Sequence, residues 1–215
     1  MYVYQQTMAH HTQKALVGLA SNKDYEENKI KKHEFTLAKK EADRTKLIDI
    51  QNASLEPVFL TFKDNQEPIK AKIEEVSTRA CYGDVTTDDG VRHVLWRCTP
   101  VEAEWFVSEF EKIPNLYVAD GHHRTAAAFN VGKLRAQRAK DAGQEVTGEE
   151  PFNFFLTLFY PADNLWVLDY NRVLKTLNDM TSEEFINKLK VNFDITEMPE
   201  GADTKPTGIH KFSLL

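Results

Sequence analysis

The densest group of polar side chains in the sequence lies in the stretch NLYVADGHHRTAAAF, at 115–129. It places an acid, a glycine, two histidines and an arginine in consecutive positions: Asp120, Gly121, His122, His123 and Arg124. An apolar run typical of a strand precedes the group, and an alanine-rich run typical of a helix follows it. The first turn of a helix presents unpaired backbone N–H groups and the positive end of the helix dipole. The pattern therefore predicts a binding site for an anion, above all a phosphate.

Two other interpretations of these residues stay open. In the first, Asp120 caps a helix, Gly121 makes the turn and Arg124 is solvated; because consecutive His-His-Arg is uncommon in a simple cap, we favour the anion site. In the second, Asp120, His122 and His123 bind a transition metal. Adjacent side chains diverge, and no further histidine stands at a typical zinc spacing, so no structural metal is expected. Magnesium carried by a nucleotide is compatible with Asp120 as its one protein ligand.

A second charged group, KIKKHEFTLAKKEADR, lies at 29–44. Most of its residues are typical of the solvated face of a helix. His33 and Glu34 differ, because they precede the expected helix start, where an imidazole and a carboxylate can act as acid and base. We therefore expect His33 or Glu34 to lie near the Asp120–Arg124 turn, with Glu34 as general base. His93, on an expected strand, is a third candidate, although a half-buried strand histidine is more often structural.

Composition argues against several classes of function. The chain has 215 residues, of which 41% are hydrophobic and 28% charged, as in a globular protein that folds without disulfides or metals. Its formal net charge of −6 disfavours nucleic acid as a partner. No apolar run reaches ~20 residues, so no membrane-spanning helix is expected, and the first residues do not resemble a secretory signal. With two cysteines, Cys81 and Cys98, the chain is expected to be cytoplasmic.

The hydrophobic pattern predicts an α/β (α+β) fold, with a mixed sheet flanked by helices. Strands are expected at 2–7, 15–21, 57–62, 115–119, 152–160 and 208–215, with two more joined by a turn within 80–99. Helices are expected at 37–50, 69–78, 100–113, 125–140 and 181–193, a turn at 63–68, and a surface loop at 21–36. The run at 152–160 is the most hydrophobic and is expected at the centre of the sheet. Thr36 is the expected N-cap of the first helix, and Thr181 with Glu184 forms a capping box.

The domain organisation follows from the two ends of the chain. The first expected strand begins at residue 2, and the last ends with the chain at Leu215. We therefore expect a single domain over 1–215, truncated at both ends. An alternative is a division into a core at 1–150 that carries the turn and a second part at 151–215.

Three stretches together resemble a known family. YVADGHHRTAAAF (117–129) resembles the ADGHHR signature of the family called domain of unknown function 1015. DYEENKIKKHEFTLAKKEADR (24–44) resembles its second signature, and VRHVLWRC (91–98) resembles its short His-x-x-Trp strand. The order and separation of the three also fit, and the resemblance covers essentially the whole chain. Members commonly have a further N-terminal segment and a longer C-terminal part, which agrees with the expected truncation.

The resemblance implies a nucleotide-binding protein. Members are often described as ParB/Spo0J-like chromosome-partitioning proteins, and the turn also resembles that of sulfiredoxins and free serine kinases, where it binds nucleotide phosphates. Carried over to this sequence, Asp120, Gly121, His122, His123 and Arg124 are the expected phosphate and nucleotide ligands. DNA binding does not carry over, because no helix-turn-helix is evident. Sulfiredoxin chemistry does not carry over either, because a histidine occupies the place of the required cysteine.

These observations predict a nucleotide-dependent phosphotransferase, similar to free serine kinases, that acts on a small polar metabolite such as serine with ATP or ADP and magnesium. Arg124 and the backbone of the turn would hold phosphate oxygens, and His122 or His123 would stabilise charge on the transferred phosphoryl group. His33 and Glu34 would act as acid and base. The alternative is a non-catalytic nucleotide-binding partitioning or regulatory protein, and a DNA-binding protein is a third hypothesis. A homo-oligomer is compatible with each.

Overall fold

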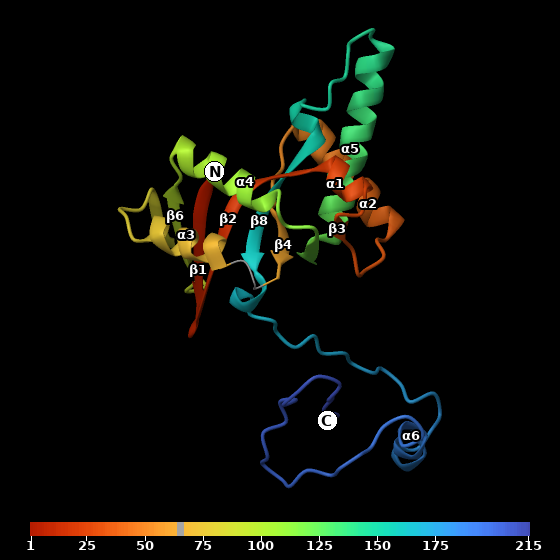
Figure 1. The fold of residues 1–215 in the computed structure, drawn as a ribbon. Helices are drawn as coiled ribbons and strands as arrows, with labels where there is room; N and C mark the ends of the chain where they lie inside the picture. The colour runs from red at the N-terminus through yellow and green to blue at the C-terminus, as the bar shows by residue number, and fades with distance from the viewer. Residues whose placement is uncertain (64–66) are drawn as a thin grey trace. The chain divides into compact units, whose positions relative to one another are not determined.

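The computed structural model describes residues 1–63 and 67–215, which divide into two compact units, Met1–Val167 and Leu168–Leu215. The described residues of the first unit form one sheet of eight strands with helices packed on it (Figure 1). The strands are β1 (Tyr2–Met8), β2 (His11–Ser21), β3 (Ile30–Lys31), β4 (Val58–Phe62), β5 (Gly83–Thr86), β6 (Arg92–Arg97), β7 (Leu116–Asp120) and β8 (Phe154–Pro161). The helices are α1 (Asn22–Glu26), α2 (Ala38–Gln51), α3 (Glu67–Ser77), α4 (Pro100–Phe110) and α5 (His122–Asp141), with short 3-10 helices at Pro151–Asn153 and Ala162–Asn164.

The sheet is mixed, as predicted, with the strand order β3-β7-β4-β8-β2-β1-β6-β5. The expected hairpins are present, β1 with β2 and β5 with β6. β8 lies in the interior of the sheet, antiparallel to β2 and parallel to β4. This place confirms the prediction for the apolar run at 152–160, because a strand covered on both faces is apolar on both. β7, which leads into the Asp120–Arg124 turn, pairs with β4 and with the short edge strand β3.

Hydrophobic clusters lie on both faces of the sheet. Successive residues of a strand point to opposite faces. Leu16 and Phe159 accordingly join the larger cluster, while Ala15 and Tyr160 join a smaller one on the other face. In the larger cluster the apolar side of α3 and the fully buried Phe106 of α4 pack against the sheet. Burial of these two helices gives the first unit its main core.

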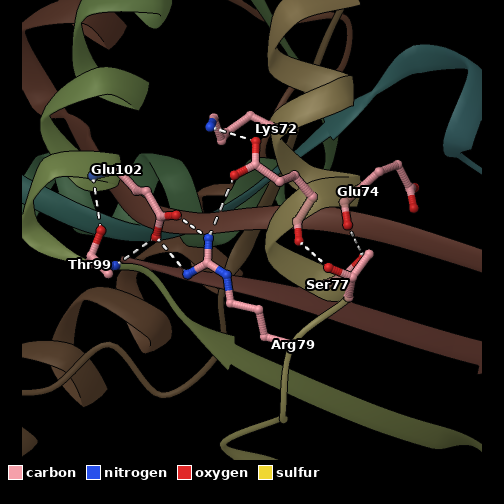
Figure 2. A network of polar contacts seen from close by, with 8 residues as sticks. Lys72, Glu74, Ser77, Arg79, Thr99 and Glu102 are labelled. Carbon is pink, nitrogen blue, oxygen red and sulfur yellow. Dashed lines mark hydrogen bonds and ion pairs between the residues drawn. The ribbon is translucent and has the colours of Figure 1, made fainter.

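A polar network joins the end of α3 to the start of α4 (Figure 2). Arg79, which follows α3, donates to both carboxylate oxygens of Glu102 in the first turn of α4. Glu102 also completes a capping box with Thr99, the N-cap of α4. The Arg79 guanidinium, aided by the bonds to Thr99, lowers the pKa of Glu102 from 4.5 to about 2. Glu102 is therefore ionised throughout the physiological range and links two helices of the core.

Glu102→Gln is expected to lower the stability of the first unit by roughly 1–2 kcal/mol at neutral pH, the value of a charge-assisted hydrogen bond reduced by solvent screening. Glutamine keeps the capping bond but loses the charge that pairs with Arg79. Because the folded-state pKa of Glu102 lies below its unfolded value, this contribution is complete above about pH 4.5 and is lost as the pH falls toward 2. Denaturant unfolding at several pH values measures the difference.

The control for this experiment is Glu104→Gln, which changes an exposed carboxylate on the same helix. Its stability should match that of the unchanged protein at every pH. Equal losses in Glu102→Gln and Glu104→Gln, or a loss in Glu102→Gln that does not shrink in acid, would contradict the role assigned to the ion pair.

The second unit, Leu168–Leu215, contains the helix α6 (Ser182–Leu189), which begins with the predicted capping box of Thr181 and Glu184. The helix ends at Leu189, before the predicted end at 193. The strand predicted at 208–215 is wrong, because these residues form a turn and irregular structure. A short, partly apolar segment forms a strand only where a partner strand is available, and no strand is present among the residues of this unit.

Several boundaries differ from those that the sequence predicts. The segment at 21–36, predicted to be a loop, contains α1 and β3. The division at residue 150 precedes β8, whereas the first compact unit continues through Val167. Within the predicted turn at 63–68, residues 64–66 lie outside the described residues. None of the described helices has the length and apolar character needed to cross a membrane.

Candidate anion-binding and acid–base site

The Asp120–Arg124 turn connects β7 to α5. Gly121 has φ of 96° and ψ of 32°, in the left-handed region that residues with a Cβ rarely adopt. α5 begins at His122 rather than at the predicted residue 125, and its N-cap is Gly121. The helix starts early because the carbonyl of Gly121 accepts hydrogen bonds from the backbone N–H and the hydroxyl of Thr125, at 2.9 and 3.0 Å. The interpretation of Asp120 as the helix cap is therefore wrong.

The start of α5 offers backbone donors to a ligand. Among the residues that the structure describes, none accepts a hydrogen bond from the backbone N–H groups of His122, His123 or Arg124. Such groups, with the positive end of the helix dipole, attract anions to helix starts. In the next turn of the helix, the small side chains of Ala126–Ala128 are buried, so α5 packs closely on the rest of the unit. The turn thus has the donors that the predicted anion site requires, while anion binding itself stays a prediction.

His122 is buried and has a defined protonation state. Its side chain lies against His33, with ring centroids 4.4 Å apart in an edge-to-face arrangement. Its Nε2 accepts from the backbone N–H of His33 at 3.5 Å, so the neutral ring carries its proton on Nδ1. That atom lies 3.6 Å from the carboxylate of Glu34. Burial, followed by the proximity of His33, lowers the pKa of His122 below its ordinary value of 6.5. His122 is therefore neutral at physiological pH, with Nδ1–H toward Glu34.

A short strand brings the two polar groups together. Ile30–Lys31, which form β3, pair in parallel with Leu116–Tyr117 of β7, so both strands run toward the same end of the sheet. His33 and Glu34 follow β3 after one intervening residue and reach the turn, although His33 is 89 positions from His122 in the sequence. Both side chains are exposed, so a ligand can reach them. The expected proximity of the two groups is therefore confirmed.

His123 holds the segment that carries Glu34. Its Nε2 accepts from the backbone N–H of Leu37 at 3.0 Å. Leu37 is the N-cap of α2 and has no capping bond from its own side chain. The prediction of Thr36 as this N-cap is wrong, because the Thr36 hydroxyl instead donates to Glu41 at 2.6 Å. His123 thus connects the start of α2 to the turn, and because Nε2 accepts this bond, its ring N–H is on Nδ1.

The guanidinium of Arg124 is engaged with the protein. It pairs with the carboxylate of Asp120, donates to the carbonyl of Pro57 at 2.8 Å and lies 3.5 Å from the carboxylate of Glu56. It also lies against Gly121, where an added Cβ would be 3.0 Å from its Nε. Arg124 is predicted as a direct phosphate ligand, but it must exchange one of these acceptors for the phosphate. The backbone N–H groups of the α5 start are therefore the first candidates for phosphate contacts.

His93, the third candidate residue of the sequence, lies outside this site. His93 on β6 hydrogen-bonds to Tyr4 at 2.6 Å, and four strands separate β6 from β7, so His93 belongs to the opposite part of the sheet.

Within residues 1–63 and 67–215, no group of three or more His, Cys, Asp or Glu is arranged to hold a metal ion. Asp120 pairs with Arg124 through Oδ2. A contact from Asp120 to magnesium on a nucleotide stays a prediction, and Oδ1 is the atom that it would use.

One carboxylate that the sequence does not single out lies beside the turn. The charged pattern of 29–44 predicts that Glu41 is solvated. The structure instead shows its carboxylate accepting from the Thr36 hydroxyl and, at 2.5 Å, from the side-chain amide of Asn130 on α5. No signal in the sequence pairs Glu41 with Asn130, because that contact depends on the packing of α2 against α5.

Comparison with known proteins identifies a family. The family model described as "Protein of unknown function (DUF1015)" matches residues 1–215, the whole length of the chain. No curated protein and no solved structure matches the chain.

Proposed function

The chain belongs to the DUF1015 family, and we propose that it is a nucleotide-dependent phosphotransferase that acts on a small polar metabolite, with ATP or ADP and magnesium as the donor. One observation carries the proposal. At the start of α5, backbone N–H donors lie close to the side chains of His33, Glu34 and His122. The donors can bind phosphate, and the side-chain group can move a proton. Phosphoryl transfer to a hydroxyl needs both.

Each residue has a definite part in the proposed reaction. The hydroxyl oxygen of the acceptor attacks the terminal phosphorus, the bond to the leaving nucleotide breaks, and the hydroxyl proton passes to Glu34. His122 presents Nδ1–H to Glu34 and orients its carboxylate. Nδ1–H of His123 is a donor for charge on the transferred phosphoryl group, and His33 is the second acid–base candidate. Magnesium, held by the phosphates and Asp120, would neutralise phosphate charge.

The second candidate function is a nucleotide sensor without catalysis. The environment of Arg124 favours it, because one guanidinium joins Asp120 in the turn to Glu56 and Pro57 in the connection before β4. A phosphate that replaces Asp120 at Arg124 would change this connection and could alter a surface for a partner. The ParB-like resemblance is compatible with such a role. The net charge of −6 disfavours duplex DNA as that partner.

Two measurements separate these functions. Calorimetry with ATP and with ADP, each with Mg²⁺, tests nucleotide binding, and a coupled assay then measures nucleotide consumption with and without hydroxyl-bearing metabolites. The phosphotransferase proposal expects binding, and consumption that rises when the acceptor is added. Binding with no stimulation by any acceptor would favour the sensor, and absence of binding would refute both. Affinity for duplex DNA that falls steeply with salt would favour the DNA-binding hypothesis.

A further inference from the structure

A groove of about 530 Å³ lies between α2 and α5, beside the candidate site. This volume lies in the range of small-molecule sites. Thr36 and Glu41 line it on one side and Asn130 on the other, while the small side chains of Ala38 and Ala42 leave it open. The groove lies beside the turn, because Leu37, between the lining residues Thr36 and Ala38, donates its backbone N–H to Nε2 of His123 at 3.0 Å.

The carboxylate of Glu41 is oriented in this groove by neutral donors. One of its oxygens accepts from the Thr36 hydroxyl at 2.6 Å and the other from the Asn130 amide at 2.5 Å. These two bonds, that of Thr36 first, lower the pKa of Glu41 below its ordinary value, so the group is ionised at physiological pH. Each carboxylate oxygen has a further lone pair that can accept from a ligand. Glu41 is therefore a fixed, half-buried negative charge in the wall of the groove.

The other carboxylate of the groove differs in its partners. Asp49 pairs with Arg135 at 3.1 Å and with Arg138 at 2.9 Å, so its charge is neutralised within the protein. Among the described residues, no lysine or arginine forms an ion pair with Glu41. Lys46 also lines the groove but forms no ion pair with Glu41. A half-buried carboxylate whose hydrogen bonds come from neutral donors gains a stronger, charge-assisted bond from a ligand that brings a cation.

We propose that this groove binds a small primary amine and that Glu41 pairs with the ammonium group of that amine. If the phosphotransferase proposal holds, the amine also carries the hydroxyl that accepts the phosphoryl group, and only this last step rests on the proposed function. The ligand class is then an amino alcohol or a hydroxylated amino acid, with its ammonium group at Glu41 and its hydroxyl toward Glu34.

Saturation-transfer NMR tests amine binding without any nucleotide. The probes are ethanolamine and serine, and the matched molecules without an ammonium group are ethylene glycol and glycerate. We expect transfer to both amines and much weaker transfer to the matched molecules. In Glu41→Gln, the amide oxygen can accept from Asn130 and the amide N–H can donate to Thr36, so the local structure is kept while the charge is removed. Amine affinity should fall about tenfold or more in this variant.

Two further variants make the test decisive. Asp43→Asn removes an exposed carboxylate of α2 that does not line the groove, so amine binding should be unchanged. Ala42→Phe fills the groove and leaves Glu41 in place, so amine binding should be lost with little change in melting temperature. This variant also keeps the proposal testable if Glu41→Gln fails to fold.

The outcomes that would overturn the proposal are equally definite. They are equal binding of ethanolamine and ethylene glycol, undiminished amine binding in Glu41→Gln or Ala42→Phe, and no binding of either amine. A protein that binds both amines in this pattern but does not bind ATP or ADP would support the groove and refute the phosphotransferase. A protein that consumes nucleotide but does not bind either amine would support the phosphotransferase and refute the amine groove.

Discussion

Glu34→Gln is expected to lower the rate of phosphoryl transfer by roughly 10²–10⁴-fold, the usual contribution of a general base. Nucleotide affinity should change little, because the proposed phosphate contacts come from the start of α5 rather than from Glu34. The amide keeps the size and the hydrogen-bonding capacity of the side chain but cannot accept the hydroxyl proton. Single-turnover kinetics with saturating nucleotide and acceptor measure the chemical step, and calorimetry measures nucleotide affinity.

Glu27→Gln is the matched control for this experiment. Glu27 is an exposed carboxylate in the connection between α1 and β3, and its ion-pair partners are Lys23 and Lys29. Removing its charge should leave both turnover and nucleotide affinity unchanged. If Glu34→Gln turns over at the rate of Glu27→Gln, Glu34 is a surface residue beside His122 and the proposed general base must be sought elsewhere.

Gly121→Ala is expected to weaken nucleotide binding by about tenfold to a hundredfold, the effect of losing a charge-assisted contact. A Cβ at φ of 96° is strained, and it would lie 3.0–3.2 Å from three atoms of the Arg124 guanidinium. The guanidinium can move aside, but the strain at φ of 96° is relieved only by movement of the backbone, and that movement shifts the N–H groups at the start of α5. Calorimetry with ATP, together with the melting temperature, measures the two consequences separately.

Gly148→Ala separates backbone strain from damage to the site. Gly148 has φ of 97°, almost the same as Gly121, but an added Cβ there meets no atom within 4 Å. Both variants should lose some stability, because left-handed backbone is unfavourable for alanine. A loss of nucleotide affinity confined to Gly121→Ala would support the anion site. Equal affinities in the two variants would mean that the turn does not hold phosphate through its backbone.

The local patterns of the sequence determined most of the first unit. Alternating side chains predicted the β1–β2 and β5–β6 hairpins, and an apolar run predicted that β8 lies inside the sheet. Glycine between an apolar run and a basic helix start predicted the turn at 120–124. These features depend on residues close together in the chain, whose preferences for strand, turn or helix are expressed before any distant contact forms. The polar residues of the turn were identifiable for the same reason.

Contacts between distant segments decided the rest. The two-residue strand β3 is too short to leave a pattern, yet its pairing with β7 carries His33 and Glu34 to the turn. The start of α2 is held by His123 rather than by Thr36, because tertiary packing places the imidazole there.

The partners of charged side chains were equally beyond local patterns. A sequence shows that Arg124 is cationic and Glu41 anionic, but only the fold brings Asp120 and Pro57 to the first and Asn130 to the second. Whether a charge is neutralised by the protein or left for a ligand depends on which groups lie within hydrogen-bonding distance. The sequence by itself thus determined which chemical groups are available, and the tertiary structure decided which of them meet.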